Sequence, residues 1–204
     1  MLDERLRPAK DRVFEPPARW LGGRVHPHLI SIIGVLPGLA AAVLGARTEY
    51  GAALLCWIVN RLLDGLDGVV SRVDRRQTDL GGYLDIVLDY VAYAAIPVGL
   101  AVGNPSPEKY AAGLLLLASF LVNAASWMYL AAILERRNLG ATVTGERTTI
   151  TMPSGLIAGT ETIIFYSLFF LFPERIPALF TMMAGLVGIT VIQRVAWAAR
   201  YIRE

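Results

Sequence analysis

The sequence predicts an all-α integral membrane protein, with six transmembrane helices preceded by an N-terminal amphipathic interfacial helix. Of its 204 residues, 55% are hydrophobic, and the mean hydropathy is +0.51; ordinary soluble domains are about 45–50% apolar. Several apolar segments approach the roughly 20 residues that a helix needs to cross a bilayer. The basic residues collect on one side of these segments, a bias typical of membrane proteins. We expect residues 1–204 to form one domain.

The first segment, residues 3–24, mixes basic side chains with apolar ones such as Val13, Phe14 and Trp20. This mixture is typical of a helix lying on an anionic membrane surface, here interrupted at Pro16-Pro17. A disordered basic arm is the alternative. The start of the chain has no long apolar core, so we expect no cleavable signal peptide.

Six apolar segments follow and would form a helix bundle over residues 27–198. The second and third contain aspartates, which lower their hydropathy, but acids inside a membrane usually indicate function. The segments are placed at 27–46, 51–71, 81–103, 110–134, 153–172 and 176–198.

The loop charges predict the orientation of the bundle. With a cytoplasmic N-terminus, the opposite side carries only Arg47, Lys109 and Arg175. We therefore expect both termini on the cytoplasmic side of a prokaryotic inner or plasma membrane. The basic residues that follow the N-terminal segment on the cytoplasmic side are Arg72, Arg75, Arg76, Arg136, Arg137, Arg147, Arg194, Arg200 and Arg203.

Four aspartates lie between Asn60 and Asp89, on either side of one short cytoplasmic loop. Asp64 and Asp67 are three residues apart, and Asp85 and Asp89 are four apart, so each pair would share one helix face. Carboxylates gathered in an apolar setting repel one another and need cations. Oxygen ligands favour a hard divalent ion such as Mg²⁺ or Mn²⁺.

Written as a pattern, this stretch is D-x-x-D-G-x-x-S-R, eight residues, then G-x-x-x-D-x-x-x-D. It resembles the signature of the CDP-alcohol phosphotransferases, D-x-x-D-G-x-x-A-R, eight residues, G-x-x-x-D-x-x-x-D. Every spacing agrees, and the one departure is Ser71 in place of the usual alanine. Serine is small enough to keep close helix packing. The matching positions are Asp64, Asp67, Gly68, Arg72, Gly81, Asp85 and Asp89.

The resemblance implies a phosphotransferase of phospholipid biosynthesis. An alcohol hydroxyl attacks the β-phosphorus of a CDP-linked lipid, most simply CDP-diacylglycerol, and CMP leaves. It also implies two Mg²⁺ or Mn²⁺ ions held by Asp64, Asp67, Asp85 and Asp89, with Asp89 as the general base. Divalent ions suit this chemistry because they neutralise the diphosphate. The family commonly forms homodimers, so we expect one here, and no nucleic-acid partner.

Several residues have two interpretations. Gly68 and Gly81 would leave room for the nucleotide, or they would only let helices approach closely. Arg72 would bind a diphosphate oxygen with Asp64 and Asp85 nearby, or it would pair with a neighbouring acid. Arg61 would balance the charge of Asp64.

The small alcohol acceptor has no recognisable motif. If it carries phosphate or carboxylate, basic residues of the cytoplasmic face would bind it, and Arg147 is the first candidate, followed by Arg136 and Arg194. Glu161, an acid in the fifth segment, would have a structural role or line the acceptor pocket.

Two other function classes remain open from the sequence. Membrane prenyltransferases are also helical and rich in aspartate, but their acidic clusters are separated by far more chain. A cation- or proton-coupled carrier would also use intramembrane acids, but it would be expected to show inverted repeats. The four acids instead fall in one third of the chain.

Overall fold

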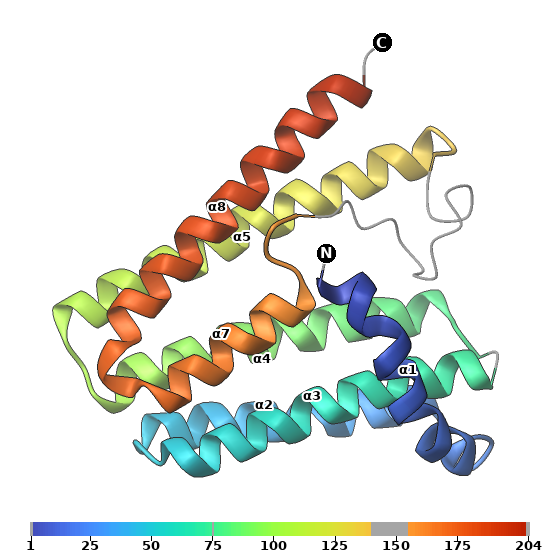
Figure 1. Cartoon of the computed structure of the whole chain (residues 1–204), viewed down its shortest axis with the longest axis horizontal. Helices are drawn as coiled ribbons and strands as arrows, with labels where there is room; N and C mark the ends of the chain where they lie inside the picture. The colour runs from blue at the N-terminus through green and yellow to red at the C-terminus, as the bar shows by residue number, and fades with distance from the viewer. Residues whose placement is uncertain (1, 75, 140–154, 203–204) are drawn as a thin grey trace.

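The computed structural model describes residues 2–74, 76–139 and 155–202, and the secondary structure in these ranges is helical. Figure 1 shows most of the long helices running back and forth along one direction, with the N-terminal helix crossing them and the helices Pro107–Arg136 and Ile176–Tyr201 splayed from the rest. The elements are α1 (Leu2–Leu21), α2 (Pro27–Ala46), α3 (Tyr50–Val73), α4 (Asp79–Gly103), α5 (Pro107–Arg136), α7 (Gly159–Leu171), the 3₁₀ turn η1 (Pro173–Arg175) and α8 (Ile176–Tyr201).

Local sequence signals explain where several helices begin. Proline stands at the first position of α2 and α5, where its missing N–H has no helical partner to lose. The side chains of Thr78 and Ser106 cap α4 and α5 by accepting the backbone N–H groups of Gly81 and Lys109.

The N-terminal segment forms one helix, α1, that continues through Pro16 and Pro17. The expected interruption at this pair is therefore wrong. Ala18 of α1 is fully buried in a cluster with Ile30, Val69 and Val70 of α2 and α3, and this packing compensates for the helical hydrogen bonds that the prolines remove. Trp20, on the same helix, remains largely exposed.

Helix α2 packs closely against both α3 and α4, and α5 packs along α8 (Figure 1). Glycines let α4 approach α2: a Cβ built on Gly99 would lie 2.1 Å from the carbonyl oxygen of Ala42. Between the two groups of helices lies an aromatic core that includes Trp57, Tyr166 and Phe180, all fully buried. Helix α7 contributes Tyr166 to this core and contacts α3.

Four of the described helices are long and apolar enough to cross a membrane, namely the spans His28–Ala46, Asp79–Gly103, Pro107–Arg136 and Pro173–Arg200. They correspond to the first, third, fourth and sixth expected segments. Helix α3 is also long enough to cross a membrane, but its charged residues make it less apolar than these four spans. Large apolar side chains stay exposed on these helices, for example Leu36, Leu114 and Ile192. Such a surface suits contact with lipid.

Helix α7 is shorter than the segment expected at 153–172, since it begins only at Gly159 and has 13 residues. The residues just before α7 form a hydrogen bond to another helix in place of a helical one: the backbone N–H of Ile157 donates to the hydroxyl of Thr190 on α8, at 2.9 Å. Because of this bond, α7 begins only at Gly159. Residues 140–154, which include Arg147 and the start of the expected segment, lie outside the described residues.

Candidate functional site

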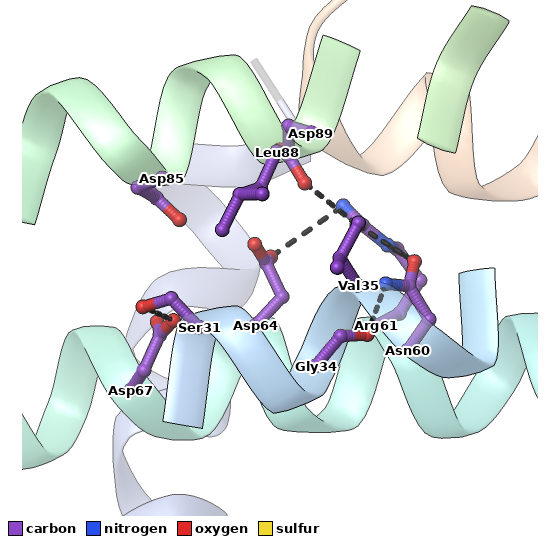
Figure 2. A pocket seen from close by; sticks show the side chains of 10 residues that line it. All are labelled: Ser31, Gly34, Val35, Asn60, Arg61, Asp64, Asp67, Asp85, Leu88 and Asp89. Atoms are coloured by element: carbon purple, nitrogen blue, oxygen red, sulfur yellow. Dashed lines mark hydrogen bonds and ion pairs between the residues drawn. The ribbon is translucent and has the colours of Figure 1, made fainter. Parts of the chain in front are cut away.

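Asp64, Asp67, Asp85 and Asp89 line one pocket between α2, α3 and α4. The first two come from the second half of α3 and the last two from the first half of α4. Figure 2 shows the two pairs on facing helices, with α2 closing the pocket from one side. The helical spacing seen in the sequence therefore does bring the four carboxylates to one place, near the turn that joins α3 to α4. The residues lining the pocket are Ser31, Gly34, Val35, Asn60, Arg61, Asp64, Asp67, Asp85, Leu88 and Asp89.

Arg61 lies among these carboxylates and links the two helices. Its Nη2 donates to Oδ1 of Asp89 at 2.6 Å, and its Nη1 lies 3.5 Å from Oδ2 of Asp64 (Figure 2). The Arg61 side chain is only 7% exposed, whereas the two carboxylates are about one quarter exposed. A charged group buried to this degree is tolerated because it is paired.

The guanidinium of Arg61 also contacts the uncharged side chains of Asn60, Tyr93 and Trp57. Nε and Nη2 donate to Oδ1 of Asn60 at 3.0 and 2.8 Å, and Nη1 donates to the hydroxyl of Tyr93 at 2.9 Å. The rings of Trp57 and Tyr93 lie 4.7 and 5.2 Å from its Cζ atom. Planar stacking and forked hydrogen bonding together fix the orientation of the guanidinium.

Asn60 and Tyr93 are themselves anchored to neighbouring helices. Asn60 donates through Nδ2 to the carbonyl of Gly34 on α2, at 2.8 Å. The backbone carbonyl of Tyr93 accepts the hydroxyl of Tyr166 on α7, at 2.6 Å. The position of Arg61 is thus set by α2, α3, α4 and α7 together.

Asp67 lies at the other end of the pocket. Its Oδ2 accepts the hydroxyl of Ser31 on α2 at 2.5 Å, and the residue is buried. Ser31 thereby fixes the direction of one carboxylate, as residues behind metal ligands commonly do.

The donor set fits a hard divalent cation by its chemistry, because the acidic groups that line the pocket offer only oxygen atoms. Their spacing is more open than a bound ion would require. Within the described ranges, no three histidine, cysteine or acidic side chains lie close enough together to hold one ion. Binding would draw the carboxylates of α3 and α4 toward one another.

The other motif residues lie beside the pocket rather than in its lining. A Cβ on Gly68 would lie 3.5 Å from Nη1 of Arg72, so the arginine folds over this glycine. A Cβ on Gly81 would lie 2.7 Å from the ring of His28, so Gly81 lets α4 approach α2. The hydroxyl of Ser71 donates to the carbonyl of Gly68 in its own helix, at 3.0 Å.

Arg136 and Arg194, the two acceptor candidates that the structure describes, are not among the pocket-lining residues, and Arg147 lies outside the described residues. Arg194 is buried and links α8 to α5 by donating from Nη1 to Asn123 and Ser126, at 2.8 and 2.7 Å. Arg136 is exposed at the end of α5. Glu161 accepts the backbone N–H of Ala158 at 3.2 Å in the first turn of α7, which is a structural contact at a helix start.

Sequence reasoning missed Ser31, Asn60 and Tyr93. Two weak signals pointed to them: Asn60 and Arg61 are adjacent polar residues in an apolar helix, and Tyr93 follows Asp89 by one helical turn. Ser31 carries no signal of its own, because its partner lies 36 residues away.

Comparison with known proteins assigns the chain to a family. Residues 24–199 match the family model described as CDP-alcohol phosphatidyltransferase. The chain is 33% identical over 196 residues to the inner membrane protein YnjF of Escherichia coli, a match that covers 96% of this chain and 94% of that protein.

The fold is also similar to solved structures of the phosphatidylinositol phosphate synthase of Mycobacterium tuberculosis. The structure with CDP-DAG bound has a TM-score of 0.68 at 22% identity, covering 91% of this chain and 92% of that one. The complex with manganese and citrate has a TM-score of 0.67 at 23% identity, covering 89% and 86%. At this level of identity the likeness concerns the fold.

Proposed function

We propose that this chain, which belongs to the CDP-alcohol phosphatidyltransferase family, transfers a phosphatidyl group from CDP-diacylglycerol to a small alcohol and releases CMP. The observation that carries the proposal is that all four motif aspartates of α3 and α4 line the same pocket. Family membership favours this reaction over prenyl transfer and over ion-coupled transport.

The reaction forms one bond and breaks one. The acceptor oxygen attacks the β-phosphorus of the donor, the bond from that phosphorus to the CMP oxygen breaks, and CMP leaves. Asp89 accepts the hydroxyl proton of the acceptor, since it lines the pocket and is partly exposed. A bound divalent cation would neutralise the diphosphate charge and align the donor.

Asp64, Asp67 and Asp85 would hold that cation, and Asp89 would be the remaining ligand if a second ion bound. Arg72 would bind a diphosphate oxygen, with Gly68 and Gly81 allowing the nucleotide to approach. These assignments rest on the motif and on the common location of the residues near the turn between α3 and α4.

The relatives support the proposed donor and location. A fold neighbour crystallised with CDP-DAG supports a CDP-linked lipid donor, and the relative named an inner membrane protein supports that membrane for this chain. The proposed topology has six spans, including α3 and α7, with α1 on the membrane surface and both termini and the pocket on the cytoplasmic side. We include a homodimer in the proposal, as the resemblance implies, and Arg136, Arg147 and Arg194 as acceptor-binding candidates.

The test is CMP release by the purified chain with Mg²⁺ or Mn²⁺ and CDP-diacylglycerol. The acceptor panel contains glycerol 3-phosphate, serine, inositol and inositol phosphate, and a chelator serves as the control. CMP release with one acceptor, abolished by the chelator, establishes both class and substrate.

Absence of CMP release across the panel directs the assay to soluble donors such as CDP-choline and CDP-ethanolamine. If no CMP is released with these donors either, the proposed reaction is contradicted.

A further inference from the structure

The pocket contains a cation of its own. The guanidinium of Arg61 lies within hydrogen-bonding distance of Asp89 and at 3.5 Å from Asp64. Arg61 precedes the family motif, which begins at Asp64, and the proposed reaction assigns it no step. Its contacts nevertheless involve the carboxylate proposed as the base.

Arg61 is built into this position and is not a mobile surface side chain. Asn60 accepts two of its N–H groups, Tyr93 accepts a third, and the Trp57 ring lies 4.7 Å from its Cζ atom. Moving the guanidinium away would break these contacts in a setting where only 7% of the side chain meets solvent. Such a move would leave buried polar groups unpaired, which is costly.

Both oxygens of Asp89 accept protein donors. Oδ1 accepts Arg61 at 2.6 Å, and Oδ2 accepts the hydroxyl of Tyr93 at 3.3 Å. A divalent ion bound to Asp89 would lie within a few ångströms of the guanidinium, and like charges at such distances repel strongly outside bulk water. The contact with Asp64 is longer and is more easily given up.

We propose that Arg61 is a positioning residue that holds Asp89 as an oriented free carboxylate outside the metal-ligand set, so that the pocket takes one divalent ion on Asp64, Asp67 and Asp85. This inference rests on the proposed function and differs from the two ions that the family resemblance implies. Arg61 fills the place that a second cation would otherwise take beside Asp89.

The experiment measures Mn²⁺ binding to purified protein without substrate, alongside CMP release. The unaltered chain binds one ion. Arg61→Met removes the competing charge and frees Asp89, so Mn²⁺ binds at least about tenfold more tightly. Turnover nevertheless falls at least about tenfold, mainly in kcat, because Asp89 is no longer oriented.

The double variant Arg61→Met/Asp89→Asn removes the ion pair as a unit, a replacement that buried pairs often tolerate. It retains one ion with an affinity within about threefold of the unaltered chain, because the three ligands are unchanged. Arg76→Gln is the control, since Arg76 is an exposed cation on the turn after α3 and outside the pocket lining. This control changes neither Mn²⁺ binding nor turnover.

Three results would overturn the inference: two ions per unaltered chain, unchanged or weaker binding in Arg61→Met, or loss of binding in the double variant. The double variant decides the question even where Arg61→Met does not fold. A chain that binds no Mn²⁺ but releases CMP contradicts the metal site and this inference with it. A chain that binds Mn²⁺ as stated but releases no CMP contradicts only the proposed reaction.

Discussion

Asp89 joins the proposed chemistry to the rest of the molecule, because its carboxylate faces the pocket while its hydrogen bonds lead into the protein interior. Arg61 holds one oxygen and Tyr93 the other. A base fixed in this way needs no rearrangement before it takes a proton from a bound hydroxyl.

Asp89→Asn should lower turnover at least about 100-fold, the size of effect typical of a general base. The amide oxygen can still accept Arg61, so the folded protein should remain. The measurement is CMP release together with the elution profile in detergent. Asp79→Asn is the matched control, because Asp79 is an exposed acid in the first turn of the same helix, and near-normal turnover in Asp89→Asn would exclude Asp89 as the base.

Ser31 and Ser71 have hydroxyl groups with different partners. The Ser31 hydroxyl donates to Asp67 from another helix, whereas the Ser71 hydroxyl donates to the backbone of its own helix. Ser31→Ala should raise the Mn²⁺ concentration for half-maximal turnover about tenfold, since Asp67 loses a group that orients it.

Ser71→Ala is the control for this change and should leave the Mn²⁺ dependence of turnover close to that of the unaltered chain. Alanine is also the residue that the family pattern carries at this position. Equal effects of the two substitutions would show that the contact between Ser31 and Asp67 does not position a metal ligand.

At the scale of the helices, the close approach of α2 and α4 decides the shape of the pocket. Ser31 and Gly34 lie on α2 and the second acidic pair lies on α4. Farther along the same pair, Gly99 meets the backbone of Ala42, and Gly103 meets that of Gly45 and Ala46. A shift of α2 away from α4 would therefore open the pocket as well as the interface.

Gly99→Ala should destabilise the protein by about 1–3 kcal/mol, the usual range for overpacking, because its methyl group meets backbone that cannot rotate away. Thermal unfolding in detergent measures this change. Gly185→Ala on α8 is the control: its methyl group meets nothing within 4 Å, so it should be neutral or stabilising by up to about 1 kcal/mol. If Gly99→Ala unfolds at the same temperature as the unaltered chain, the packing of α2 against α4 does not require the close approach at Gly99.

Across the whole molecule, the arrangement combines a group formed by α2, α3 and α4 with the pair α5 and α8, and aromatic side chains fill the space between them. The pocket belongs to the first group. Arg194 belongs to the second, where it joins α8 to α5. These contacts explain how a basic residue of the C-terminal helix can be buried.

The proposed topology predicts that the turn between α2 and α3 and the turn between α3 and α4 lie on opposite sides of the membrane. In a Cys56→Ala background, Glu49→Cys should react with an impermeant maleimide in intact cells. Arg76→Cys should react only after permeabilisation. Labelling of both positions from the same side would show that α3 does not cross the membrane, despite its length of 24 residues.

Much of the arrangement could be predicted from the sequence, because it depends on the local chain. Periodicity places Asp64 with Asp67, and Asp85 with Asp89, on common helix faces, and hydropathy places the third segment at 81–103, close to the observed α4 (Asp79–Gly103). The motif spacing also leads to the family. The late start of α7 and the unbroken α1 could not be predicted, because Thr190 and Ala18 act there through contacts with other helices.

By itself, the sequence determined the helical class, the register of the acidic residues and the family, since short-range spacing and hydropathy carry that information. The tertiary structure decided which residues meet around the acids. Arg61 is bonded to Asp89, 28 residues away, and Ser31 reaches Asp67 from α2. Such pairs depend on how far each helix is rotated about its axis, and the packing of the whole bundle sets that rotation.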